Sequence, residues 1–167
     1  MATLALVGCT QAPGPIKTTG AVEAVCAPGR NQQRAVIALD ILVNSGSTPQ
    51  RLVDIQLDQP QGVILVGAQL VPSSQNTVGT APWEGQPNQI EQSRVDPDTT
   101  VDLKVAIQAI SATQVGYARG AILTFAAPDG STSKVHTCTR LAVSPGEVPC
   151  SNDALPDVSD YLRSVCS

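Results

Sequence analysis

The sequence has very few aromatic residues. They make up 2% of its 167 residues and are Trp83, Tyr117, Tyr161 and Phe125. A hydrophobic core therefore has to be built from the aliphatic residues that dominate the 42% hydrophobic share. Valine and isoleucine fit the pleated, half-buried surface of a sheet, so this composition favours strands. The length suits one domain with a core of its own.

Charged residues are also scarce. They account for 14% of the chain, with a net charge of −4, and the ten basic residues are spread without a cluster. A nucleic-acid-binding protein needs a basic stripe to displace counterions from phosphates, so that class is excluded. A polybasic membrane-surface patch is excluded for the same reason. The sequence has no run of 18 apolar residues, which a transmembrane helix would need.

Residues that carry chemistry are few. His136 is the single histidine, and the chain has neither a nucleophile elbow nor a glycine-rich phosphate loop. Asp96 and Asp98 flank Pro97 in what the sequence predicts to be a solvated turn. His136 and Cys138 share one face of a predicted strand, but zinc sites usually combine four ligands with closely spaced cysteines. We predict no catalytic site, no metal site and no cofactor.

Strand-like segments separated by turn signals fill most of the chain. They cover residues 16–26, 34–43, 51–57, 63–71, 99–107, 117–125 and 133–143. In 51–57, Val53, Ile55 and Leu57 alternate with polar residues, and Gly67 predicts a bulge in 63–71. Residues 128–130 (Pro-Asp-Gly) predict a hairpin turn. About seven short strands without intervening helices predict an all-β fold, an immunoglobulin-like antiparallel sandwich over residues 16–145.

The C-terminal appendage, residues 146–167, is the one part with a helical pattern. Val158, Tyr161, Leu162 and Val165 share one face of a helix. A helix this short needs external support, and a disulfide could supply it.

Five cysteines are the most informative residues. Cys9 follows Leu6, Val7 and Gly8, which resembles a bacterial lipobox, so residues 1–15 are interpreted as a signal remnant, lipidation site and tether. The leader is shorter than a signal peptide requires. A short N-terminal strand with an incidental cysteine is the alternative.

The other four cysteines allow three pairings. No strand-like segment lies between Cys150 and Cys166, whereas Cys26 and Cys138 both lie in predicted strands. We therefore expect the disulfides Cys26–Cys138 and Cys150–Cys166, as in an exported protein.

Residues 72–98 form a long irregular insertion that includes the single tryptophan. Such insertions in compact domains are functional or disordered. Trp83, with its neighbours Pro82 and Glu84, is the candidate partner-binding site, because tryptophan is favoured at interface hot spots. Alternatively, Trp83 closes one end of an aromatic-poor sandwich.

The lipobox-like segment Leu6–Cys9, the strand and loop Asn44–Ile55 and the segment Ala118–Cys138 together resemble envelope lipoproteins of actinobacteria. The resemblance implies an extracytoplasmic protein, lipid-anchored on the outer face of a bacterial membrane, that touches the membrane only through its anchor. It also implies a non-catalytic binding or scaffolding module that contacts an envelope or membrane protein complex.

A second resemblance is to periplasmic copper-chaperone domains, in the turn that leads into residues 51–55. Those domains bind copper through methionine and histidine, and this chain has Met1 and His136 alone. The alternative function is therefore a degenerate small-ligand or metal carrier.

Overall fold

The computed structural model describes residues 14–19, 23–29, 34–73, 79–80, 90–91, 94–137, 139–146 and 148–150. Every regular element in these residues is a strand, which confirms the all-β prediction. The strands are β1 Ile16–Thr18, β2 Glu23–Gly29, β3 Arg34–Asn44, β4 Gln50–Asp58, β5 Val63–Pro72, β6 Gly79–Thr80, β7 Ile90–Glu91, β8 Arg94–Val95, β9 Thr100–Ala109, β10 Gly116–Ala118, β11 Gly120–Ala126, β12 Thr132–His136 and β13 Thr139–Pro145. The described residues contain no helical span suited to crossing a membrane. The predicted C-terminal helix lies outside them.

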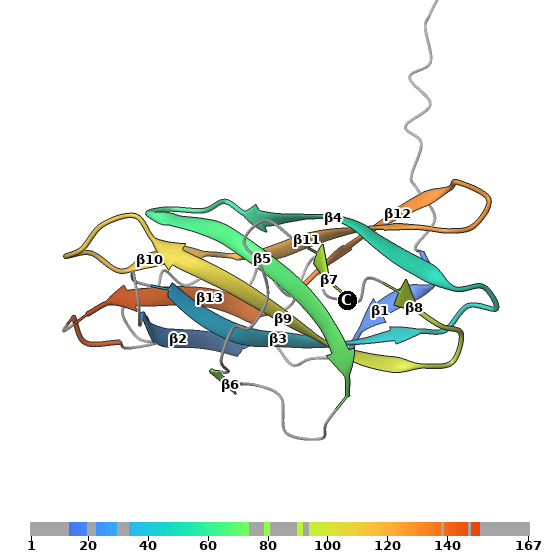
Figure 1. Ribbon diagram of the computed structural model, residues 1–167, viewed down its shortest axis with the longest axis horizontal. Helices are drawn as coiled ribbons and strands as arrows, with labels where there is room; N and C mark the ends of the chain where they lie inside the picture. Colours follow the sequence, from blue (N-terminus) through green and yellow to red (C-terminus); the bar gives the residue numbers. More distant parts are fainter. Residues whose placement is uncertain are drawn as a thin grey trace, which may run out of the picture.

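The strands form three sheets that run along the long axis of the molecule (Figure 1). One sheet has the order β1-β3-β9-β5-β7, with β6 also paired to β3. The others have the orders β12-β11-β4-β8 and β10-β13-β2. Most pairs are antiparallel as predicted, but β13 with β2 and β5 with β7 are parallel. The first and last long strands of the domain therefore lie side by side.

Two segments predicted as single strands each divide between two sheets. Residues 117–125 divide into β10 and β11, and residues 133–143 divide into β12 and β13. The divisions meet where Gly120 (φ 155°) adjoins Thr137, whose Oγ1 accepts a hydrogen bond of 2.8 Å from the amide of Ala121. A Cβ on Gly120 would lie 2.8 Å from that Oγ1. The chain changes sheet here because a glycine permits the close approach.

The bulge predicted at Gly67 is confirmed by a register shift between Leu65 and Gly67. The alternation predicted in β4 is wrong at Val53. Thr124 and Phe125 of β11 face Asp54 and Leu52, so Val53 is an extra residue in the ladder and is 39% exposed. Such a bulge on β4 cannot be read from the period of β4 alone, because it depends on the partner strand.

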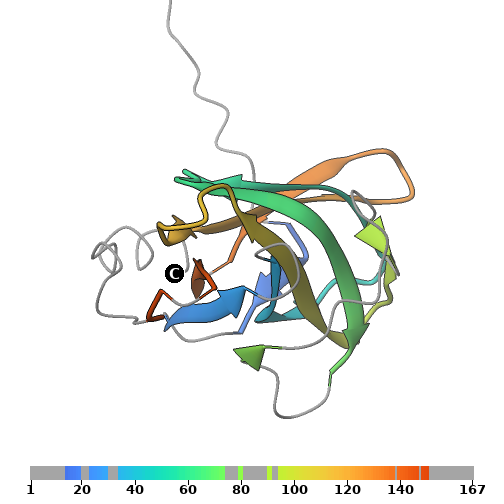
Figure 2. The ribbon, with the colours of Figure 1, turned by 60° about the vertical axis from the view of Figure 1, so that its left-hand side comes forward.

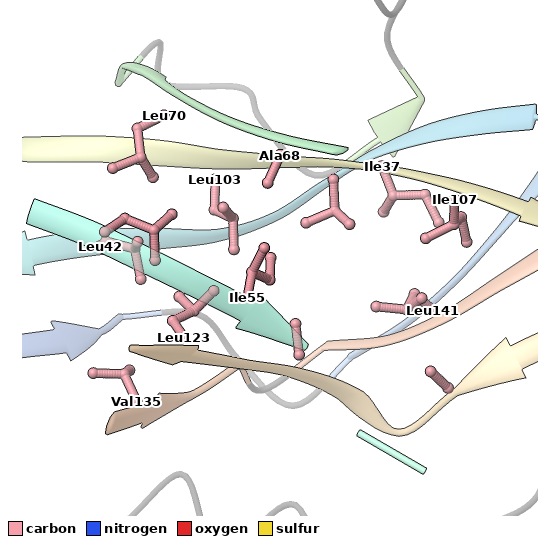
Figure 3. Packing of buried hydrophobic residues seen from close by; sticks show 14 of the residues in the cluster. Ile37, Leu42, Ile55, Ala68, Leu70, Leu103, Ile107, Leu123, Val135 and Leu141 are labelled. Carbon is pink, nitrogen blue, oxygen red and sulfur yellow. The ribbon is translucent and has the colours of Figure 1, made fainter. Parts of the chain in front are cut away.

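One hydrophobic core lies between the sheets (Figure 3). β9 contributes Leu103, Val105 and Ile107, all fully buried, as the alternation in residues 99–107 predicts. Side chains of β3 and β5 flank them, and β4, β11, β12 and β13 supply the opposite wall. Phe125 is fully buried, and the other core residues are aliphatic. Figure 2 shows how strongly the strands curve around this core.

Candidate functional site

Most residues that the sequence singles out lie outside the described part of the chain. This applies to Cys9, Cys138 and Cys166, and to the candidate partner site Trp83, Pro82 and Glu84. Their predicted roles stay predictions. Cys26, Cys150 and His136 are described and can be placed.

Cys26 forms a disulfide with Cys150, with an S–S distance of 2.00 Å. The predicted pairing of Cys26 with Cys138, and of Cys150 with Cys166, is therefore wrong. The reason is the parallel pairing of β2 with β13, in which Cys26 lies beside Ala142. After β13 ends, the chain brings Cys150 back to β2, an arrangement between distant segments that cysteine spacing cannot reveal. The bond crosslinks residues 124 positions apart, which stabilises the fold by about 5 kcal/mol in the chain-entropy model.

His136 is half-buried at the end of β12, opposite Ile122 of β11. Its neighbour Val135 points into the core, so the histidine lies on the outer face of the four-stranded sheet. The described residues include no group of three or more His, Cys, Asp or Glu side chains that could hold a metal ion.

Asp129 lies in the β11–β12 hairpin turn. A hydrogen bond of 2.6 Å from Ser131 Oγ, and one of 2.9 Å from the Ser131 amide, lower the pKa of its carboxyl group. Such bonds are usual for an aspartate in a turn, and they serve the hairpin rather than a reaction.

The end of the domain next to β1 is organised by Asn44, which is fully buried. Its Nδ2 donates to the carbonyl of Thr48 (2.9 Å) and to that of Val95 (3.0 Å). Its Oδ1 accepts from the amide of Gly46 (3.0 Å). One side chain thus fixes the β3–β4 turn and holds it against β8.

The same turn holds the N-terminal segment. Both the amide and the hydroxyl of Ser45 donate to the carbonyl of Pro15, at 3.0 and 2.9 Å. Gly46 approaches so closely that a Cβ there would lie 2.6 Å from the Pro15 side chain. Pro15, directly before β1, is therefore fixed at this end of the domain. Asp96 and Asp98 are exposed here, as the solvated-turn prediction states.

The opposite end is built from the β4–β5 and β9–β10 connections. Gln61 and Tyr117 exchange two backbone hydrogen bonds of 2.8 and 2.9 Å. Gly116 packs so tightly that a Cβ would lie 2.2 Å from the carbonyl oxygen of Gly62. Two backbones in direct contact make this end compact.

This end, defined as residues 59–64 and 108–118, contains no charged residue. It exposes two isoleucines, Ile64 at 48% and Ile110 at 67%. Ile110 lies opposite Gly62 in the extended β5–β9 ladder, through a hydrogen bond from its amide to the Gly62 carbonyl (2.9 Å). Ile64 and Ile110 are therefore diagonal neighbours on one face. We call Ile64, Ile110 and the half-buried Tyr117 the apolar end.

Sequence reasoning did not single out the apolar end. Its one sequence signal is the absence of charge from two segments separated by more than 40 residues, which only the fold brings together. No family model, curated protein or solved structure matches the chain.

Proposed function

We propose that this chain is an exported, non-catalytic binding or scaffolding module of a cell envelope, tethered at one end and contacting a protein partner with the other. The Cys26–Cys150 disulfide supports an oxidising, extracytoplasmic compartment, where such bonds persist. The single observation that carries the binding role is the apolar end, with Ile64 and Ile110 exposed on one face.

The placement of the two ends agrees with this role. β1, which follows the N-terminal segment, lies at one end of the long axis, and β10 lies at the other (Figure 1). A lipid on Cys9 would anchor the β1 end and direct the apolar end away from the membrane. The proposed partner is a protein of an envelope complex, because aliphatic and tyrosine side chains without charge suit the centre of a protein interface.

The finer fold assignment is part of the same proposal. Face-to-face packing of largely antiparallel sheets around an aliphatic core supports an immunoglobulin-like sandwich. In such a scaffold the connections at the ends are the usual binding elements.

Site-specific crosslinking tests the binding role. A photoreactive amino acid at position 110 should yield a discrete adduct in intact envelopes, and Ile64→Ser should abolish it because the two side chains share one face. The matched control is Val53→Ser, since Val53 is also exposed (39%) but lies on the four-stranded sheet. Equal adducts in both variants, or none from position 110, would reject this surface.

The tether has a separate test. Expressed with its complete native leader, the protein should partition into detergent, and Cys9→Ser should move it to the aqueous phase. Equal partitioning of the two forms would remove the lipid from the proposal and leave the apolar end unaffected.

A further inference from the structure

A row of three side chains crosses the outer face of the six-stranded sheet at the apolar end. Arg34 of β3 lies opposite Gln108 of β9, and Gln108 lies opposite Ile64 of β5. Ile107, next to Gln108, belongs to the main core, so the side chains of this row point away from that core. Ile110 follows Gln108 by two residues and shares its face. An arginine therefore lies in the same patch as the two exposed isoleucines.

The side chain of Arg34 makes one hydrogen bond within the part of the chain that the structure describes. Its Nε donates to Oε1 of Gln108 at 3.1 Å, which fixes the guanidinium beside the residue that separates it from Ile64. The ion pair found among the described residues is a different one, Arg94 with Asp96. The terminal nitrogens of a guanidinium form a planar fork that can bind a carboxylate through two parallel hydrogen bonds.

Apolar side chains border this arginine along the sheet. Val36, two residues farther on the same face of β3, is buried against Val66 and Ala106. Ile64 ends the row on the other side. Apolar neighbours keep water away from an ion pair and reduce its screening. A carboxylate bound to Arg34 would therefore interact more strongly than one on a fully polar surface.

We propose that the binding partner places an acidic side chain on Arg34, next to an aliphatic side chain that packs on Ile64 and Ile110. This inference rests on the proposed binding role of the apolar end and names the chemistry that the partner presents to it. The backbones at Arg34 and Ile64 are two strand spacings apart, roughly 10 Å, so a partner segment of a few residues reaches both. The arginine then acts in specificity, because an apolar patch alone accepts many aliphatic surfaces.

A second copy of this chain does not supply the acid. In a two-fold dimer the same surface patch serves on both chains, so the contact would join two apolar ends. Residues 59–64 and 108–118 contain no acidic residue, and the row of Arg34 adds none. A free anion would bind the guanidinium but leave both isoleucines exposed. The patch therefore suits a different protein that carries a carboxylate beside an apolar side chain.

Crosslinking from position 110 in intact envelopes tests the inference when the charge of Arg34 is removed. Arg34→Gln should lower the adduct yield about tenfold, as expected for the loss of a hydrogen-bonded charge. Arg34→Lys, which keeps the charge but not the fork, should lower it less. The matched control is Lys104→Gln, which removes a positive charge from the same face of β9, four residues from Gln108, and should leave the yield unchanged.

An exchange of charges tests the acid itself. Peptide mapping of the adduct locates the crosslinked segment of the partner protein, and each aspartate or glutamate in that segment is replaced by arginine. One replacement should abolish the adduct of the wild-type chain and restore that of Arg34→Glu. A mapped segment without an acidic residue, or no restoration by any replacement, would overturn the acidic contact.

Failure of this inference can be told apart from failure of the binding role. An adduct that Ile64→Ser abolishes, but that Arg34→Gln and Lys104→Gln leave equally strong, would overturn the acidic contact and keep the apolar end as a binding surface. No adduct from position 110 would reject that surface, and this inference with it. An adduct between two copies of this chain would also contradict an acid-bearing partner.

The wild-type chain provides a test that needs no change at Arg34. Raising the salt concentration from about 0.1 M to about 1 M shortens the screening length from about 10 Å to about 3 Å, so an adduct that depends on the arginine should weaken. A contact made by the isoleucines alone should be unaffected or strengthened by salt. A yield that stays constant or rises would therefore contradict the inference even if Arg34→Gln fails to fold.

Discussion

The two ends of this domain are held by different means. At the β1 end, the buried side chain of Asn44 joins the β3–β4 turn to β8 through hydrogen bonds, and the surroundings include the exposed Asp96 and Asp98. At the apolar end, Gly62 and Gly116 bring two backbones into contact, and residues 59–64 and 108–118 themselves contain no charged residue, although Arg34 of β3 donates a hydrogen bond to the side chain of Gln108. A polar end whose hydrogen bonds are satisfied internally suits a tether, and an end that exposes two isoleucines suits a contact.

The disulfide strengthens the apolar end. Tyr117 of β10 lies beside Ala142 of β13, and Ala142 lies beside Cys26. Tyr117 in turn lies beside Gln61 of the β4–β5 connection. One row of neighbouring residues therefore joins the crosslinked Cys26 to that connection. Covalent and backbone constraints therefore both reach the β4–β5 connection that precedes Ile64, and rigid support lowers the entropy lost on binding.

Removal of the disulfide should have the largest effect. The double variant Cys26→Ser with Cys150→Ser is expected to lose up to about 5 kcal/mol of unfolding free energy, because the unfolded chain regains its freedom. Chemical denaturation measures the loss, with Ser47→Ala as the unperturbed control. Peptide mapping without reductant should recover Cys26 joined to Cys150, and recovery of Cys26 joined to Cys138 would contradict the structure.

Gly116→Ala should cause the next largest loss of unfolding free energy. Its Cβ would meet the Gly62 carbonyl oxygen at 2.2 Å, backbone against backbone, so the two connections must separate. Overpacking of this kind is expected to cost about 3 kcal/mol. The matched control is Gly130→Ala, where the new Cβ meets nothing within 4 Å and the cost is mainly that of φ +84°, about 1 kcal/mol. Equal losses in the two variants would refute the close approach.

Asn44→Ala, at the β1 end, should lower the unfolding free energy by no more than Gly116→Ala does. It removes three hydrogen bonds and leaves the buried Val95 carbonyl without its donor, a loss of about 2–3 kcal/mol. Denaturation of Asn44→Ala beside Ser47→Ala, an exposed position in the same turn, measures it. A loss no greater than that of Ser47→Ala would show that the turn holds without the asparagine.

Local patterns predict much of this fold. The alternation in β9, the turn at residues 128–130 and the bulge at Gly67 all depend on residues close in sequence, and each is confirmed. The disulfide pairing failed because it depends on β2 lying parallel to β13, more than 100 residues away. The prediction of one continuous strand over residues 133–143 failed for the same reason, since the break at Thr137 depends on Gly120 lying beside it.

The candidate site was harder to predict than the fold. Residues 63–66 form a continuous apolar run, and such a run does not reveal which members will be covered. In the structure Ile64 is exposed and Val66 is buried, although they lie two residues apart. Val66 packs with Val36 of β3 and Ala106 of β9, so its burial depends on neighbouring strands that the pattern of β5 does not show.

The double variant Ile64→Ser with Ile110→Ser tests most directly whether the protein binds through its apolar end, and it should change stability least. Ile64→Ser with Ile110→Ser should alter the unfolding free energy by roughly 0.5 kcal/mol per site, because both side chains are exposed. With the protein captured by crosslinking at position 110 as ligand, affinity should fall at least about tenfold, equivalent to roughly 1.4 kcal/mol. Val53→Ser should bind like wild type. Unchanged affinity in the double variant, with full folding, would contradict a module that binds through its apolar end.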